Sequence, residues 1–185
     1  MIKSIRGLSI AVLTAAMCGC IGSSNPVIPE SARTFDPRLV GTWSDSALTK
    51  RAVITQTGPL SYGIQYTENQ DQPLSLTGLL GRSRRGFILD VQATKAALGP
   101  YDDLVVRLHL AMVLDTIGPR IRVAILEPDS LDKYLRTNPG AIAHGRMTDN
   151  VMLTADTPEL WQFLATYLQR PSALAAPTLW IRRSP

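Results

Sequence analysis

The chain has 185 residues, of which 45% are hydrophobic and 18% are charged, and its formal net charge at pH 7 is +4. These proportions are typical of an ordinary globular protein, and the length suits a single domain. The positive charge is too small to indicate a polyanion-binding protein, so no nucleic-acid partner is expected.

The first 19 residues have the features of a secretory signal peptide. Met1 to Arg6 carries two positive charges and no acid, and Leu8 to Met17 is apolar apart from Ser9 and Thr14. This run is shorter than the roughly 20 apolar residues of a membrane-spanning helix. We therefore predict a cleaved signal peptide over residues 1–19, and the loss of its two positive charges leaves a net charge of +2.

Both cysteines of the chain follow this apolar run. Cys20 is preceded by the small residue Gly19, whereas Cys18 is preceded by the bulky Met17. The pattern resembles the lipobox of bacterial lipoproteins, in which the peptidase cuts after a small residue and the next cysteine carries the lipid. The resemblance implies lipid attachment at Cys20 and loss of Cys18 with the signal peptide. A metal or redox pair would need further ligands, which no other cysteine supplies, and a free thiol after ordinary signal cleavage is the competing interpretation.

A lipobox implies a place in the cell envelope. Fully processed bacterial lipoproteins are anchored in the membrane by acyl chains, palmitate among them. Ile21 follows the cysteine where an aspartate typically signals retention in the inner membrane. The resemblance therefore implies an outer-membrane lipoprotein that faces the periplasm, with another envelope protein or a cell-wall polymer as its partner besides the membrane.

The segment after the cysteine is dominated by Ser, Asn and Pro. Ile21 to Phe35 shows no apolar periodicity. Such a composition favours an extended or disordered chain, so residues 20–35 are predicted to be the lipidated cysteine and a flexible tether. The remaining residues, 36–185, are predicted to form one β-rich domain.

Most of this domain has the period-two alternation of strands. Leu104 to Leu114 has a wholly apolar face on its even positions, and Arg120 to Glu127 alternates again after a Gly-Pro turn, which predicts a hairpin. We expect the even face from Leu104 to Met112 to pack against a helix over Leu160–Leu168 and against the facing strands. Further predicted strands are Ala52–Thr57, Ser61–Thr67, Leu74–Leu80, Phe87–Val91 and Pro177–Arg183. Short strands at this spacing predict an antiparallel sandwich or barrel.

Two helices are predicted within this β-rich pattern. The first, Pro128–Thr137, precedes an Asn-Pro-Gly stop. The second begins after Asp156, which can cap its first turn together with Pro158, and is ended by Pro171. Its apolar residues recur at helical spacing from Leu160 to Leu168.

The start of the domain carries a second resemblance. Phe35 to Ser44 (FDPRLVGTWS) is similar to the opening of many small bacterial lipoprotein domains and, more distantly, of lipocalins and other calycins. Calycins have a Gly-x-Trp in the first strand and an arginine near the end of the last, here Trp43 and Arg182 or Arg183. The resemblance implies a mainly β fold, with an antiparallel barrel or strongly curved sheet of about eight strands and two helices. It also implies that one arginine stacks on the Trp43 indole.

No residue pattern predicts a catalytic, cofactor or metal site. His109 and His144 have no nucleophile or acid at a fixed spacing, so a hydrogen-bonded or solvated histidine is the expected state. Asp102 and Asp103 are too few for a hard-cation shell and fit a turn. One charged cluster stands out, in a predicted hairpin loop: Arg82, Arg84 and Arg85. It is either a solvated turn that discourages edge pairing or a contact for an anion such as lipid phosphate or a wall polymer.

Three function classes remain open. The first is a non-enzymatic envelope lipoprotein with a binding or structural role, the second is a lipocalin-like carrier of a small apolar ligand, and the third is an envelope hydrolase. A carrier needs a hollow barrel, whereas the predicted inward residues are large and fill a small barrel. This favours the first class.

Overall fold

The computed structural model describes residues 21–69, 71–94, 107–147 and 150–183. The predicted signal peptide and the predicted lipid site at Cys20 lie outside the described residues, as do Asp102, Asp103 and the start of the predicted strand at Leu104. Among the described residues, no helix is long and apolar enough to cross a membrane.

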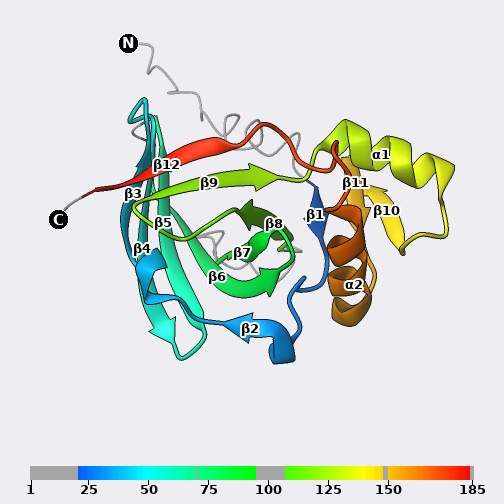
Figure 1. The fold of residues 1–185 in the computed structure, drawn as a ribbon, viewed down its shortest axis with the longest axis horizontal. Helices are drawn as coiled ribbons and strands as arrows, with labels where there is room; N and C mark the ends of the chain where they lie inside the picture. The colour runs from blue at the N-terminus through cyan, green and yellow to red at the C-terminus, as the bar shows by residue number, and fades with distance from the viewer. Residues whose placement is uncertain (1–20, 70, 95–106, 148–149, 184–185) are drawn as a thin grey trace, which may run out of the picture.

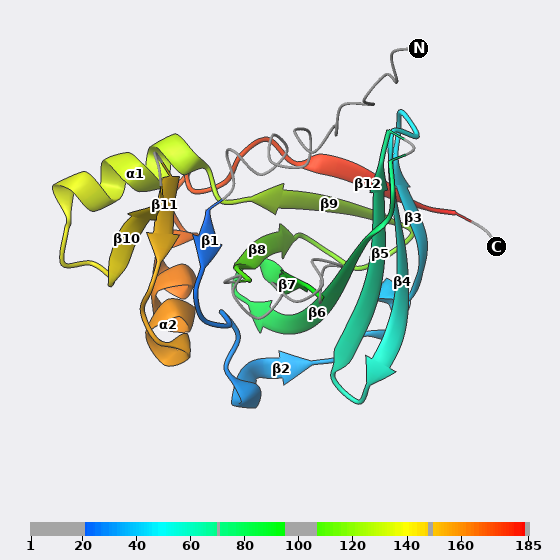
Figure 2. The ribbon, with the colours of Figure 1, turned by 180° about the vertical axis from the view of Figure 1, so that it is seen from behind.

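The described chain forms twelve strands, two α-helices and two short 3-10 helices (Figure 1; Figure 2). The strands are β1 (Gly22–Ser23), β2 (Arg33–Thr34), β3 (Gly41–Asp45), β4 (Lys50–Gly58), β5 (Ser61–Glu68), β6 (Leu74–Ser83), β7 (Gly86–Ala93), β8 (His109–Leu114), β9 (Arg120–Ile125), β10 (His144–Met147), β11 (Asn150–Leu153) and β12 (Thr178–Arg183). The helices are η1 (Glu30–Ala32), η2 (Pro37–Leu39), α1 (Pro128–Thr137) and α2 (Thr157–Tyr167).

Eight of the strands close into an antiparallel barrel. Their order is β8-β7-β6-β5-β4-β3-β12-β9, and β9 pairs again with β8. In Figure 1 the barrel wall formed by β3, β4 and β5 lies on the side away from the two α-helices. The predicted fold class, an antiparallel barrel of about eight strands with two helices, is confirmed.

Strand β8 also joins the barrel to a smaller sheet. Its last residues, Met112 to Leu114, pair with β9, whereas His109 and Leu110 pair with β1. Strand β1 runs parallel to β11, which pairs with the edge strand β10. Helices α1 and α2 lie beside this smaller sheet (Figure 1). The same strand therefore belongs to the barrel at one end and to a lateral layer at the other.

The two sides of the barrel wall face two different hydrophobic cores. Leu114 belongs to the core inside the barrel, together with Trp43 and Tyr62. Val113 belongs to the outer core, together with Leu160 and Leu164 of α2. Side chains of successive strand residues point to opposite faces, so a barrel strand covered by helices is buried on both sides.

The expected packing of the even face of β8 on α2 is therefore wrong for its described residues, whereas its expected packing against the facing strands is confirmed. Leu110 and Met112 pack against the barrel interior, and the helix packs with the odd-numbered Ala111 and Val113. The even face is the more apolar one because it fills the barrel. The small outer residue Ala111 still belongs to the core that includes α2.

The local signals for the helices lie where they were predicted. Helix α1 covers Pro128–Thr137, with the proline in its first turn. In α2 the Asp156 carboxylate accepts a hydrogen bond of 2.9 Å from the backbone N–H of Glu159. This bond satisfies one of the donors that a helix N-terminus otherwise leaves unpaired.

The prediction of a flexible tether is wrong for the described residues of that segment, 21–35. Ile21, Val27 and Ile28 are only 4%, 2% and 0% exposed and belong to the outer core. Strand β1 is hydrogen-bonded on both sides, and Asn25 donates its side-chain amide to the carbonyl of Ala155 at 2.9 Å. A segment without apolar periodicity is ordered here because its few aliphatic side chains enter a core built by distant residues.

Candidate functional site

One end of the barrel is closed by the chain that precedes β3. The 3-10 helix η2 lies at this end, and Trp43 of β3 is buried next to it, with 1% of its surface exposed. The indole Nε1–H donates a hydrogen bond of 2.8 Å to the carbonyl of Leu39. Arg182 is the register partner of Trp43 in β12, and its Cζ atom lies 5.7 Å from the centre of the Trp43 ring. The structure therefore brings Trp43 and Arg182 together.

The Arg182 guanidinium also fixes the backbone of η2. It donates through Nη1 to the carbonyl of Arg38 at 2.9 Å and through Nη2 to the carbonyl of Val40. Gly41 has a φ of +143°, and a Cβ there would lie 3.0 Å from Nη2 of Arg182. The glycine of the Gly-x-Trp motif thus gives the guanidinium room. Arg183 points elsewhere and donates to Oγ of Ser44 at 2.6 Å.

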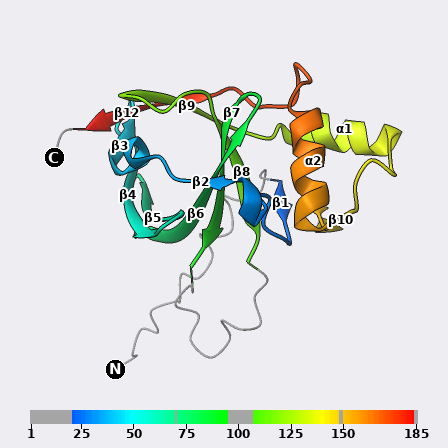
Figure 3. The same ribbon diagram turned by 60° about the horizontal axis from the view of Figure 1, so that its bottom comes forward.

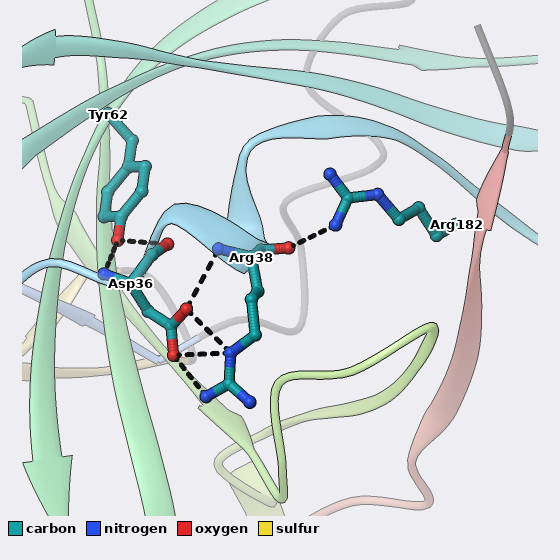
Figure 4. Close-up of polar contacts among 4 residues, drawn as sticks. All are labelled: Asp36, Arg38, Tyr62 and Arg182. Atoms are coloured by element: carbon teal, nitrogen blue, oxygen red, sulfur yellow. Dashed lines mark hydrogen bonds and ion pairs between the residues drawn. The ribbon is translucent and has the colours of Figure 1, made fainter.

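Asp36 and Tyr62 complete this closed end, as Figure 4 shows. The Asp36 carboxylate accepts from Nε of Arg38 at 3.0 Å and from Nη2 at 2.6 Å, and the hydrogen bonds from Arg38 hold the pKa of Asp36 below its usual range. The Tyr62 hydroxyl, on a residue with no exposed surface, accepts from the Asp36 backbone N–H at 2.7 Å. Burial raises the pKa of Tyr62. These polar groups satisfy one another, so they seal the barrel.

An apolar pocket of about 80 Å³ lies inside the barrel and extends from Trp43 at the closed end toward the opposite end. Its lining includes Ala52, Tyr66, Leu76, Met112, Val123 and Trp180. The rings of Tyr66 and Trp180, both partly exposed, lie 6.4 Å apart at its wall. Sites for drug-sized ligands have volumes of about 300 Å³ or more. The interior is therefore mostly filled by its own side chains, as their size predicted.

His109 is part of a buried polar network on the outer side of the barrel wall. Its Nδ1 lies 3.0 Å from Oδ1 of Asp90, whose side chain has no exposed surface, and its Nε2 lies 2.9 Å from Nε2 of Gln92. With an ionised Asp90, Nδ1 donates and Nε2 accepts from the Gln92 amide, an assignment inferred from the network. Oδ2 of Asp90 accepts from the backbone N–H of Val27 at 2.9 Å. Both imidazole nitrogens are thus engaged, and Asp90 links His109 of β8 to Val27 of the N-terminal segment.

Sequence reasoning missed Asp90 as the acid next to His109. The two residues are 19 positions apart and approach only through the β7–β8 register, which pairs Gln92 with His109. The available signal was a single charged residue within the apolar run of β7. His144 has a simpler environment, since its Nδ1 lies 2.9 Å from the carbonyl of Ile142.

A second hollow, of about 540 Å³, lies between α2 and the loop that precedes β10. Tyr134, Ile142 and Phe163 provide its apolar surface, and Glu159 and Gln162 provide polar groups. Tyr134 also stacks under Arg170, whose Cζ lies 4.7 Å from the ring centre. Sequence reasoning did not identify this groove, because its walls come from separate elements.

The arginine-rich turn predicted from the sequence connects β6 and β7. Arg84 and Arg85 are exposed in it, and Cζ of Arg82 lies 5.3 Å from the ring centre of Phe87. The turn lies near the closed end, since the adjoining Leu80 and Gly81 pair with β2, which precedes η2. Within the part of the chain that the structure describes, no group of three His, Cys, Asp or Glu side chains could hold a metal ion. Comparison of the chain with protein families, with curated proteins and with solved structures gave no match.

Proposed function

We propose that this protein is a membrane-anchored envelope lipoprotein whose barrel is a binding module, and that the open end of the barrel takes a small apolar group of its partner. The observation that carries this proposal is the 80 Å³ apolar pocket in a barrel that is sealed at the other end. Among the described residues, such a barrel leaves one end for a ligand group to enter. The lipid anchor itself rests on the sequence pattern around Cys20.

The size of the pocket favours a side chain or a short alkyl group over a whole fatty acid. Its lining is apolar throughout, with Leu76, Met112 and Val123 partly exposed on the wall. Binding of a partner that buries such partly exposed apolar surface gains free energy from the hydrophobic effect. The lipocalin-like carrier, the alternative function, would need a barrel several times more hollow.

The ordered N-terminal segment supports an anchor that lies close to the folded domain. Ile21 is buried, and Cys20 directly precedes it. One residue spans at most about 3.6 Å. A lipid on Cys20 would therefore hold the folded domain at the membrane surface without a spacer. The domain would then bind a partner that lies close to the membrane.

The anchor is tested by replacing each cysteine in turn. We expect Cys20→Ser to abolish incorporation of labelled palmitate and to leave an uncleaved precursor, because the acceptor thiol is gone. Cys18→Ser is the matched control and should leave both labelling and cleavage intact, since Cys18 leaves with the signal peptide. Palmitate labelling that survives in the Cys20→Ser variant would contradict the assignment.

The pocket is tested with a short and a long apolar probe. We expect 1-hexanol to shift the methyl resonances of Met112 and Val123 in a saturable manner, and a fluorescent fatty acid to show no stoichiometric binding. Val123→Phe should remove the hexanol response because it fills the pocket, whereas Val53→Phe, on the opposite face of the wall, should keep it. Tight stoichiometric binding of the fatty acid would support the carrier instead.

A further inference from the structure

The closed end of the barrel carries a concentration of arginine. At least seven of the 19 basic residues of the chain lie there, all of them among the described residues. They are Arg38, Arg82, Arg84, Arg85, Arg120, Arg122 and Arg182, which we call the basic pole. We infer that the basic pole docks on the phosphate headgroups of anionic lipids.

The pole is assembled from four parts of the chain that meet at one end of the barrel. Figure 3 shows the β6–β7 hairpin and the start of β9 at the same end, near β3 and β12. A Cβ on Gly86 of the β6–β7 hairpin would lie 2.3 Å from the backbone oxygen of Asp115, so the hairpin touches the β8–β9 turn. Asp115 in turn accepts a hydrogen bond of 2.7 Å from Nε of Arg122.

The other two parts are held by Arg182. Its guanidinium bonds the carbonyl of Arg38, and its backbone N–H donates to the carbonyl of Pro119 at 2.9 Å, next to Arg120. Arg38 pairs with Asp36, which also lies within the field of Arg82. The four parts of the chain that carry the pole are therefore held together by contacts among the described residues.

The basic pole keeps a net positive charge after its ion pairs with aspartates are counted. Asp36 and Asp115 pair with members of the pole, and the seven arginines together with these two aspartates carry a formal charge of +5. The side chains of Arg84, Arg85 and Arg120 are exposed and form no hydrogen bond or ion pair among the described residues. These three guanidinium groups can bind an external anion without breaking a hydrogen bond or ion pair among the described residues.

The residue type points to phosphate. Every member of the pole is arginine, whose planar fork matches phosphate oxygens in a bidentate manner and is less strongly hydrated than the lysine ammonium. Clustered basic residues near a membrane are attracted by the negative potential of anionic lipids, an effect that decays within a Debye length of about 8 Å at physiological salt. An exposed cluster on a domain held at the membrane surface fits this range.

The membrane location in this inference rests on the proposed function, but the docking itself is separable from the lipid anchor. A chain that begins at Ile21 lacks Cys20 and keeps both hydrophobic cores and the contacts described above. We would measure its binding to vesicles of phosphatidylcholine and phosphatidylglycerol in a seven-to-three ratio, and to vesicles of phosphatidylcholine alone. Failure of palmitate labelling would refute the anchor, whereas failure of vesicle binding would refute the docking.

The matched variants remove two positive charges each. We expect Arg84→Gln with Arg85→Gln to weaken binding to the anionic vesicles by about fivefold for each arginine, or about 25-fold for the pair. Arg51→Gln with Lys133→Gln changes two exposed residues outside the pole and should weaken vesicle binding much less. High salt should abolish the difference between the two vesicle types.

Three results would overturn the inference. They are equal binding of the unmodified chain to anionic and neutral vesicles, an equal loss in both double variants, and retention on immobilised dextran sulfate without vesicle binding. The last result would assign the pole to a soluble polyanion such as a wall polymer.

Discussion

A chain that begins at Phe35 should show no cooperative unfolding transition, whereas a chain that begins at Ile21 should unfold in a single step. The difference is the segment that carries β1, η1 and β2. This segment contributes three buried side chains to the outer core, from Ile21, Val27 and Ile28. It also supplies the strand that connects β8 of the barrel with β11 of the lateral sheet.

The expected size of this effect follows from burial. Each fully buried aliphatic side chain stabilises a fold by about 1.5–3 kcal/mol. Without Val27, the Asp90 carboxylate also loses the backbone N–H that it accepts, and a buried acceptor left unpaired costs about 1–3 kcal/mol. The sum approaches the whole stability of a typical domain, which is about 5–15 kcal/mol. Urea unfolding followed by circular dichroism measures it.

Point variants keep this prediction testable if the shortened chain does not fold. Ile28 has no exposed surface, so Ile28→Ala should cost about 2–5 kcal/mol. Glu30→Ala, two residues later and exposed, should change stability by no more than about 0.5 kcal/mol. If the chain from Phe35 unfolded at the same urea concentration as the chain from Ile21, the segment would be a tether after all.

The barrel could be predicted from the sequence because each of its strands shows, within its own residues, which side chains face inward. Inward residues recur at every second position, and in β8 these are Leu110, Met112 and Leu114. Period-two alternation is a local property that a single strand displays in full. The packing of the outer face on α2 could not be predicted in the same way. Ala111 and Val113 are apolar because they contact the outer core that includes α2, and the sequence of β8 alone does not show this contact.

The N-terminal segment shows the converse case. Its buried aliphatic residues, Ile21, Val27 and Ile28, are spaced irregularly, so no helical or strand period marks them. Composition predicted disorder because the segment has too few apolar residues to form a core of its own. The segment is ordered because it packs on the barrel wall and the lateral sheet. Close contacts such as that of Ile28 with Gly81 exist only in the folded chain.

The closed end was predicted in part. Resemblance to the calycin opening indicated Trp43 and an arginine of the last strand, but the choice between Arg182 and Arg183 depends on which one faces inward. The β3–β12 register pairs Arg182 with Trp43 and places Arg183 next to Thr42. Sequence reasoning likewise found the arginines of the β6–β7 turn, whereas topology brings the other members of the basic pole to the same end.

A chain that ends at Ala176 should also lose cooperative unfolding, because it lacks the strand that closes the barrel. Strand β12 pairs with β3 on one side and with β9 on the other. Its removal would expose the edges of both neighbours, take Trp180 from the pocket wall and uncover the indole of Trp43. An opened barrel exposes its apolar interior, so the shortened chain should also bind the dye ANS.

The contribution of the arginine on Trp43 can be separated from that of the strand by two variants of equal charge change. Arg182→Ala removes the cation–π contact and two hydrogen bonds to the backbone of η2, and we expect it to destabilise the domain by about 2 kcal/mol. Arg120→Ala removes a neighbouring exposed arginine without such contacts and should change stability by no more than about 0.5 kcal/mol. Equal effects of the two variants would mean that net charge, rather than the seal over Trp43, stabilises this end. If the chain that ends at Ala176 unfolded as the full chain does, the barrel would not depend on closure by β12.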